Sequence, residues 1–291
     1  MDCLVLARLT VRMTSNRRSI LVLGATGKTG SRVVSQLRQH DVEVRAASRN
    51  GATRFDWGDE GTWAPALDGA GAAYVVVPEE VDGAERVSAF GALAAARGVE
   101  RLVLLSARDW ANSGGEAELA SERAVQGAGT AWTILRPTWF AQNFSEAPWL
   151  RDPVLGGEVV LSTGQGLEPF IDADDIAAVA VAALTEDGHA GETYELSGPR
   201  LLTFGDAVAE IAAASGRDVR YVPVDQAAFA AYAAEHGAPP ETIEVLNALY
   251  GWIAEGREAH LSDGVQRALG REPRDFSDYV KAAAASGAWR D

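Results

Sequence analysis

The sequence contains little of the material from which disulfides and metal sites are made. Among 291 residues there is a single cysteine, Cys3, so a disulfide bond within the chain is excluded. The histidines are His40, His189, His236 and His260. None of them has a metal-ligand spacing to another or to Cys3. The sequence therefore predicts no metal centre.

Long apolar runs and an excess of positive charge are also missing. No stretch approaches the roughly 20 apolar residues that a membrane-spanning helix needs. The 26 Lys and Arg residues against 41 Asp and Glu residues give a net charge of −15. Such a surface repels phosphate backbones and anionic lipids, so neither nucleic acid nor a membrane is expected as a partner. We expect a cytoplasmic protein that acts on a small molecule.

The best-defined pattern that is present lies between Ser19 and Asn50. A short, branched apolar run at Ile20–Leu23 predicts a buried strand. A glycine-rich turn follows, and from Lys28 onward the apolar residues have helical spacing. A second strand is expected at Val42–Ala47. A strand, glycine turn, helix and strand within about 30 residues form the setting of a dinucleotide-binding fingerprint.

Three glycines in the segment GATGKTG have separate physical roles. Gly24 permits the tight turn off the strand, Gly27 lets the backbone approach a pyrophosphate, and Gly30 lets the helix pack close to the sheet. The N–H groups and positive dipole end of the helix then face the phosphates. The predicted phosphate-binding loop also contains Thr26, Lys28 and Thr29. An α/β turn without a ligand is the alternative.

The end of the second strand bears on the choice of cofactor. Sites that prefer NAD(H) often place a carboxylate there to accept the ribose 2′-OH. Here the residues are Ser48, Arg49 and Asn50. A guanidinium in place of a carboxylate suits a 2′-phosphate, so we expect NADP(H) to be preferred over NAD(H). The alternative is that Arg49 is only a solvated loop residue.

Two further strand ends are candidates for cofactor contacts. Asp56 lies near the end of a third short strand, where it could accept a hydrogen bond from an adenine amino group or simply stabilise a turn. Val77 and Pro78 end a fourth strand, at the edge where open α/β sheets bind ligands. We expect these two residues to contact the cofactor ribose.

Candidate substrate residues follow the fifth and sixth strands. Ser106 directly follows the apolar run RLVLL and could donate a hydrogen bond to a substrate carbonyl or imine nitrogen, or cap a helix. Trp139, Phe140 and Phe144 could form the wall of a substrate pocket, or pack where two lobes meet. Asn143, which lies between them, is a second candidate for hydrogen bonding to substrate.

The pattern along the chain predicts an α/β fold. We expect a Rossmann-type, doubly wound parallel sheet with a smaller, mostly helical C-terminal substrate lobe. Residues 1–18 are predicted to be a disordered extension, with a short extra strand as the alternative. Residues 19–150 would form the NAD(P)-binding domain, and residues 151–291 the second lobe, interleaved with the sheet. Helices at 225–261, broken at Ala238–Pro240, could form a lid or the interface of a homo-oligomer.

Several segments together resemble a known family. GATGKTG, SRN, TILRP followed by WFAQNF, PFIDADDIA and GETYELSGP occur in the order seen in the NmrA-like family of atypical short-chain dehydrogenases. The resemblance extends from Ile20 to the C-terminus. Within the family, the sequence is similar to type 2 quinone oxidoreductases and ergot-alkaloid iminium reductases. It implies a Rossmann domain, a small lobe and a pocket between them. The implied cofactor contacts are Gly24, Thr26, Gly27, Gly30 and Arg49.

One departure from ordinary short-chain reductases concerns catalysis. Those enzymes use a Tyr to protonate the carbonyl oxygen and a Lys four residues later to lower the pKa of that Tyr. None of the six Tyr residues here has a Lys at that spacing, and residues 116–122, near the expected helix, contain neither residue type. Tyr-assisted alcohol oxidation is therefore not expected.

The sequence favours an NADPH-dependent reductase that transfers hydride to a small, electron-poor substrate. A quinone, an enone, or an imine or iminium ion needs little help from an acid. Two alternatives stay open. One is a regulator that senses NAD(P) without catalysis and binds a partner protein. The other is a redox-neutral biosynthetic enzyme on the same fold. Turnover of NADPH would distinguish the reductase from both the regulator and the redox-neutral enzyme.

Overall fold

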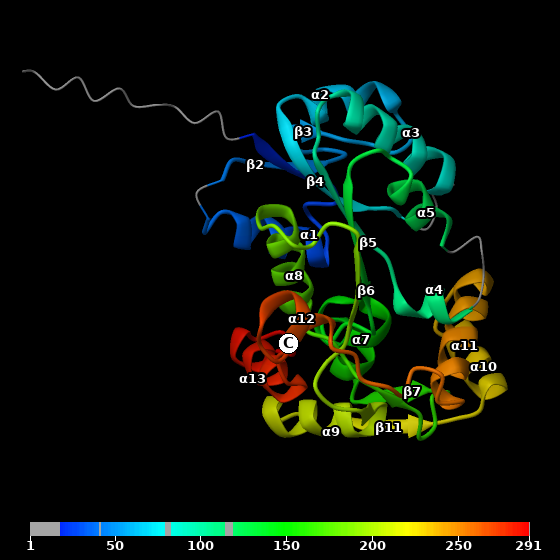
Figure 1. The fold of residues 1–291 in the computed structure, drawn as a ribbon. Coiled ribbons are helices and arrows are strands. Elements are labelled where there is room, and N and C mark those ends of the chain that lie inside the picture. The colour runs from blue at the N-terminus through cyan, green and yellow to red at the C-terminus, as the bar shows by residue number, and fades with distance from the viewer. Residues whose placement is uncertain (1–17, 41, 79–82, 114–118, 291) are drawn as a thin grey trace, which may run out of the picture.

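The chain was analysed as a computed structural model, which describes residues 18–40, 42–78, 83–113 and 119–290 (Figure 1). Apart from Arg18, the predicted disordered extension at residues 1–18 lies outside the described residues. Figure 1 shows a sheet flanked by helices in its upper half and a mostly helical lobe in its lower half.

The main sheet of the described chain has seven parallel strands. In spatial order they are β3 (Thr53–Arg54), β2 (Val44–Ser48), β1 (Ser19–Val22), β4 (Ala70–Val76), β5 (Arg101–Leu105), β6 (Ala131–Pro137) and β9 (Glu192–Leu196). The order reverses between β1 and β4. The crevice beyond the carboxyl ends of the strands at such a point is where open α/β sheets bind ligands.

Helices cover both faces of this sheet (Figure 1). One layer contains α1 (Lys28–Leu37), α8 (Ala173–Thr185) and α12 (Gly264–Leu269), and the other contains η1 (Glu60–Thr62), α2 (Trp63–Leu67), α3 (Gly83–Ala96) and α5 (Ala120–Gln126). Ile20 and Val22 of β1 pack against the first layer, whereas Leu21 and, directly after the strand, Leu23 pack against the second. Burial on both faces explains why this strand is a continuous apolar run rather than an alternating one.

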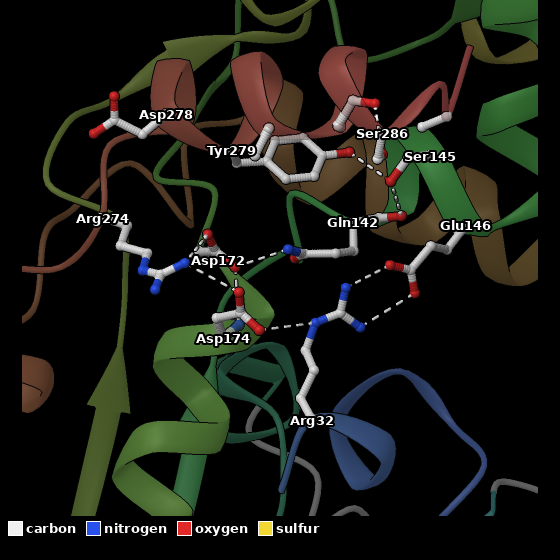
Figure 2. Close-up of a pocket in the computed structure, with 13 residues that line it drawn as sticks. Arg32, Gln142, Ser145, Glu146, Asp172, Asp174, Arg274, Asp278, Tyr279 and Ser286 are labelled. Carbon is white, nitrogen blue, oxygen red and sulfur yellow. Dashed lines mark hydrogen bonds and ion pairs between the residues drawn. The ribbon is translucent and has the colours of Figure 1, made fainter. Parts of the chain in front are cut away.

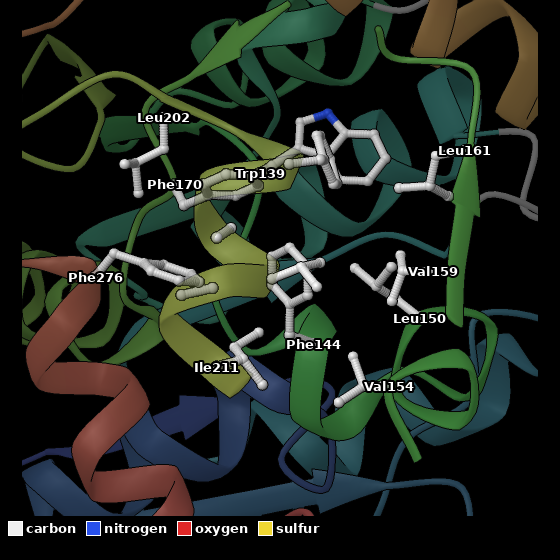
Figure 3. Close-up of a cluster of buried hydrophobic side chains, with 14 of the residues drawn as sticks. Trp139, Phe144, Leu150, Val154, Val159, Leu161, Phe170, Leu202, Ile211 and Phe276 are labelled. Carbon is white, nitrogen blue, oxygen red and sulfur yellow. The ribbon is translucent and has the colours of Figure 1, made fainter. Parts of the chain in front are cut away.

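The second lobe is built from helices and two small sheets. Its helices are α6 (Asn143–Glu146), α7 (Pro148–Gly156), α9 (Phe204–Ser215), α10 (Gln226–Glu235), α11 (Pro240–Ala254) and α13 (Phe276–Ser286). Its strand pairs are β8 (Leu167–Glu168) with β10 (Leu202–Thr203), antiparallel, and β7 (Glu158–Leu161) with β11 (Arg220–Pro223), parallel. Aromatic rings fill its core, and the ring centroids of Phe170 and Phe204 are 5.0 Å apart (Figure 3).

The predicted doubly wound sheet with a mostly helical C-terminal lobe is confirmed. β5 has the predicted bounds, and the helix break at Ala238–Pro240 is present because Pro240 begins α11. The lobes interleave, since β9 returns to the sheet beside β6 after the small sheets have begun.

One segment differs from what its composition suggests. The Asn, Ser and Gly residues between Asp109 and Gly115 are typical of a polar loop, but the structure has the short helix α4 (Arg108–Ser113) there. Arg108 anchors the first turn through hydrogen bonds to a distant segment, Glu258–His260. Tertiary contacts thus override a weak local preference.

Candidate active site

The glycine loop between β1 and α1 has the geometry that phosphate binding requires. Gly24 has φ +62°, in the left-handed region that favours glycine. A Cβ on Gly30 would lie 2.2 Å from the carbonyl oxygen of Gly24, so only glycine fits where α1 meets the loop. Gly24, Thr26 and Gly27 are exposed, whereas Thr29 and Gly30 are buried beneath them.

The N-terminus of α1 is open to a ligand. Gly27 is its N-cap residue and has no side chain to accept a hydrogen bond from the N–H groups of the first turn. The N–H groups of a first helical turn have no partner within the helix and carry the positive end of its dipole. They are therefore suited to a pyrophosphate.

Arg49 directly follows β2, and because β1 and β2 are parallel it lies at the same edge of the sheet as the glycine loop. Its side chain is exposed, and among the described residues it has no ion-pair or hydrogen-bond partner. Ser48, the last residue of β2, is half-buried beside it. An unpaired guanidinium at this strand end is free to bind a 2′-phosphate.

Asp56 has a structural role in a turn. One of its carboxylate oxygens, Oδ1, accepts the N–H of Gly58 at 2.9 Å, and its carbonyl accepts Nε1 of Trp63 at 2.9 Å. These bonds support the turn alternative, and an adenine contact stays a prediction. At the end of β4, Val77 is half-buried and Pro78 is exposed, while the carbonyl of Val76 accepts Nε1 of Trp57 at 3.0 Å.

Ser106 is engaged with a residue that the sequence did not indicate. Its Oγ donates to Oε1 of Glu122 on α5 at 2.5 Å. Glu122 is buried and also accepts Nε and Nη2 of Arg136, at 2.9 and 2.6 Å. While the Ser106–Glu122 bond holds, Ser106 offers a ligand its oxygen lone pairs rather than a proton. The predicted role of Ser106 as a donor to substrate therefore requires that Glu122 release it.

The three predicted pocket aromatics are divided between two cores. Phe144 has no exposed surface, and Trp139 is 7% exposed; both belong to the core of the second lobe (Figure 3). This corrects the predicted pocket role of Phe144, because a side chain without exposed surface cannot contact a ligand unless the core opens. It supports the alternative that these two rings pack the lobe. Phe140 packs against the sheet core and stays half-buried.

Asn143 begins α6 and is half-buried. Within the part of the chain that the structure describes, its side-chain amide has no hydrogen-bond partner. Of the two predicted hydrogen-bonding residues, Asn143 is thus the one with a free donor.

A pocket of about 550 Å³ lies between α1, α6, α8 and α13 (Figure 2). Arg32 of α1 bridges two acids across it, with Nη2 2.6 Å from Glu146 Oε1 and Nε 3.2 Å from Asp174 Oδ1. Gln142 Nε2 donates to Asp172 Oδ1 at 2.7 Å. This lining is polar and charged, unlike the aromatic pocket expected from the sequence.

The pocket adjoins the phosphate loop. Burial lowers the pKa of the Lys28 ammonium, while Glu146 raises it and Arg32 lowers it. Lys28 at the start of α1 is therefore close to the pocket's charged residues. The cation at this helix end adds to the positive potential that a pyrophosphate would meet.

The described residues contain neither a membrane-spanning helix nor a metal site. Among the described residues, no helix is long and apolar enough to cross a bilayer. No group of three or more His, Cys, Asp or Glu side chains in those residues is placed to hold a metal ion.

These features define a class of protein. A parallel sheet of this order, a glycine loop ending at an uncapped helix and an exposed Arg at the end of β2 fit a dinucleotide cofactor. The residues present therefore match a Rossmann-type NAD(P)-binding protein.

Comparison with known proteins identifies the family. Residues 24–187 match the family model described as NAD(P)H-binding. The chain is 33% identical to the NAD(P)H azoreductase of Xenophilus azovorans over 284 residues, covering 92% of this chain and 98% of that protein. It is 31% identical to the agroclavine dehydrogenase of Claviceps fusiformis over 277 residues, covering 90% and 96%.

A solved structure agrees on the fold. The NADPH-dependent quinone oxidoreductase of Escherichia coli, complexed with NADPH, superposes with a TM-score of 0.78 at 24% identity, covering 90% of this chain and 99% of that one. The protein belongs to the NAD(P)H-binding, NmrA-like family of atypical short-chain dehydrogenases and reductases, a family of NAD(P)H-dependent oxidoreductases.

Proposed function

We propose that this protein is an NADPH-dependent reductase whose substrate is a small, electron-poor molecule: a quinone, an enone, or an imine or iminium ion. The observation that carries the proposal is the exposed glycine loop at the uncapped N-terminus of α1, together with the unpaired Arg49 at the end of β2. The relatives support it, since their names include an azoreductase, an agroclavine dehydrogenase and an NADPH-dependent quinone oxidoreductase.

The chain's own residues would divide the work of binding. The first-turn N–H groups of α1 would hold the pyrophosphate, and the guanidinium of Arg49 would pair with the 2′-phosphate. Ser48, Val77 and Pro78 border the same crevice edge. Bound dinucleotide supplies the hydride, and the protein supplies orientation and a site from which water is excluded.

The residues near the expected position of the nicotinamide favour substrates that need little protonation. No Tyr in the sequence has a Lys four residues later, and the proton of Ser106 is held by Glu122. In the segment after β6, Phe140 is half-buried, and the side-chain amide of Asn143 has no hydrogen-bond partner among the described residues. A neutral amide can orient a carbonyl or imine but is a poor acid, so the electrophile itself must be activated.

Steady-state oxidation of NADPH against a panel of quinones, enones and preformed iminium ions tests this function. We expect turnover with at least one of these classes and none with simple secondary alcohols plus NADP⁺. Tight binding of NADPH without turnover on the whole panel would refute the reductase and favour a dinucleotide-sensing regulator or a redox-neutral enzyme.

The preference for NADPH depends on Arg49. Arg49→Ala is expected to raise the Kd for NADPH by roughly 10-fold to 100-fold, because a hydrogen bond to a charged group contributes about 1.5–3 kcal/mol. The Kd for NADH should hardly change, since NADH lacks the 2′-phosphate. Fluorescence titration with both dinucleotides measures the two constants.

Arg38→Ala is the matched control, because Arg38 caps the opposite end of α1. It should leave both constants as in the wild type. Equal weakening of NADPH and NADH by Arg49→Ala, or no weakening of either, would show that Arg49 does not recognise the 2′-phosphate.

A further inference from the structure

A fully buried arginine joins the sheet domain to the second lobe. Arg108, the first residue of α4, has no exposed surface. Its Nε donates to Glu258 Oε2 at 2.8 Å, its Nη2 to the Glu258 carbonyl at 2.8 Å, and its Nη1 to the His260 carbonyl at 3.0 Å. Because α4 follows β5 and Glu258 follows α11, these bonds fix the end of α11 against the carboxyl edge of the sheet.

This cluster contains more carboxyl groups than one guanidinium can neutralise. Asp109 lies next to Arg108 on α4, and Glu168 Oε1 on β8 is 3.9 Å from Arg108 Nη2. Glu168 has no exposed surface and Glu258 is 1% exposed. If all three carboxyls were ionised, the buried cluster would carry a net charge of −2, which the desolvation penalty of buried ions opposes strongly.

Two carboxylate oxygens in the cluster accept no hydrogen bond from the described residues. Glu168 Oε1 accepts the N–H of Trp139 at 3.3 Å, but Glu168 Oε2 and Asp109 Oδ1 are buried and have no hydrogen-bond partner among the described residues. An ionised carboxylate without donors is unfavourable in such a place, whereas a protonated carboxyl is neutral.

The direction of the pKa shifts agrees with this geometry. Burial, and then repulsion by Glu258, raises the pKa of Asp109 to about 7, against the opposing effect of Arg108. Burial, and then Asp109, raises the pKa of Glu168 well above its usual range. Other charged groups near this segment are Glu195, whose Oε2 is 3.9 Å from Nε2 of His260, and the exposed ion pair between Arg257 and Glu255.

We propose that Arg108, Asp109, Glu168 and Glu258 form a proton-holding cluster that positions three elements of the active-site edge: the segment after β5, the segment after β6, and the end of α11. Asp109 and Glu168 are protonated when these elements are packed together. We assign these residues a positioning role rather than contact with substrate, because Arg108, Glu168 and Glu258 are buried and the half-buried Asp109 has its Oδ1 buried. The inference goes beyond the proposed function and does not depend on it.

The sign of the pH effect follows from proton binding. In an opened state Asp109 regains a pKa of about 3.9, so between about pH 4 and about pH 7 the packed state binds more protons than the opened one. Raising the pH through this interval therefore favours opening, and the effect levels off above the pKa of Asp109 in the packed state. For this one group, opening should increase roughly tenfold between about pH 6 and about pH 8.

Hydrogen exchange of the full chain, followed by mass spectrometry at about pH 6 and about pH 8 and corrected for the intrinsic pH dependence of exchange, tests the cluster. Peptides from α4 and from residues 255–263 should show the roughly tenfold increase in opening. Asp109→Asn should reduce this increase, and the double variant Asp109→Asn/Glu168→Gln should abolish it, because amides keep the shape without titrating.

Asp152→Asn is the control, since Asp152 is exposed on α7 and should leave the wild-type pH dependence intact. Unchanged opening in the wild type between the two pH values would overturn the proposal. So would a double variant that keeps the full increase. If the double variant does not fold, the wild type and Asp109→Asn still decide the matter. Because the experiment uses no cofactor or substrate, a negative result would not bear on the proposed reductase function.

Discussion

Gly30→Ala should abolish measurable NADPH binding and lower the free energy of unfolding by about 1–3 kcal/mol. The new Cβ would lie 2.2 Å from the carbonyl oxygen of Gly24, 2.8 Å from its carbonyl carbon and 3.1 Å from Cα of Ala25. All three atoms belong to the backbone, so no side chain can rotate away. The loop must shift as a unit, and the N–H groups that face the pyrophosphate shift with it. Urea unfolding and NADPH titration measure the two effects.

Gly156→Ala is the matched control for this substitution. Gly156 ends α7, has no positive φ, and a Cβ there would meet nothing within 4 Å. We expect unchanged NADPH binding and a stability equal to or slightly above that of the wild type. Normal NADPH affinity in a folded Gly30→Ala protein would contradict the assignment of this loop as the phosphate site.

Arg108→Met should lower the free energy of unfolding at neutral pH by about 3–5 kcal/mol, the usual cost of removing one partner of a buried ion pair. The substitution keeps an apolar stem of similar length but leaves the carboxylate of Glu258 buried without its counter-charge. Part of the loss should be recovered at about pH 5, where the buried carboxyls can take up protons. Urea unfolding at the two pH values gives both numbers.

Arg54→Met provides the comparison, because Arg54 is 62% exposed and its partner Asp59 is 47% exposed. An exposed pair contributes about 0–1 kcal/mol, so this variant should be nearly as stable as the wild type at both pH values. Equal stabilities for Arg108→Met and Arg54→Met would mean that the buried cluster adds nothing to the packing of the two lobes.

Local patterns predicted most of the fold and the conformation of the glycine loop. The roles of Gly24 and Gly30 follow from spacing within one turn, because the conformational demand of a tight turn acts over a few residues. β5 and the break before α11 were predictable for the same reason: an apolar run and a proline pair act locally.

The polar contacts at the sheet edge were not predictable, because they join residues far apart in sequence. Arg108 and Glu258 are separated by 150 positions, and nothing in either neighbourhood indicates the other. Glu122 was noted only for being neither Tyr nor Lys, yet α5 carries it to Ser106. A strand-end position shows that a side chain lies near the crevice but does not show which partner reaches it.

The aromatic segment after β6 shows the same limit. Trp139, Phe140 and Phe144 lie within six residues of each other in sequence, which suggests one common surface. The chain turns there into α6, so Phe144 faces the rings of Phe170 and Phe276 in the second lobe, while Phe140 packs on the sheet. The direction of each ring depends on that turn, and no spacing rule covers an irregular segment.

The most direct test of the central claim, that the crevice edge at Gly24–Gly30 and Arg49 is an NADPH site, is a fluorescence titration of the purified wild-type chain with NADPH and NADH. We predict saturable binding of both, with NADPH bound at least about tenfold more tightly because only NADPH carries the 2′-phosphate. No binding of either dinucleotide, or NADH bound as tightly as NADPH, would contradict it.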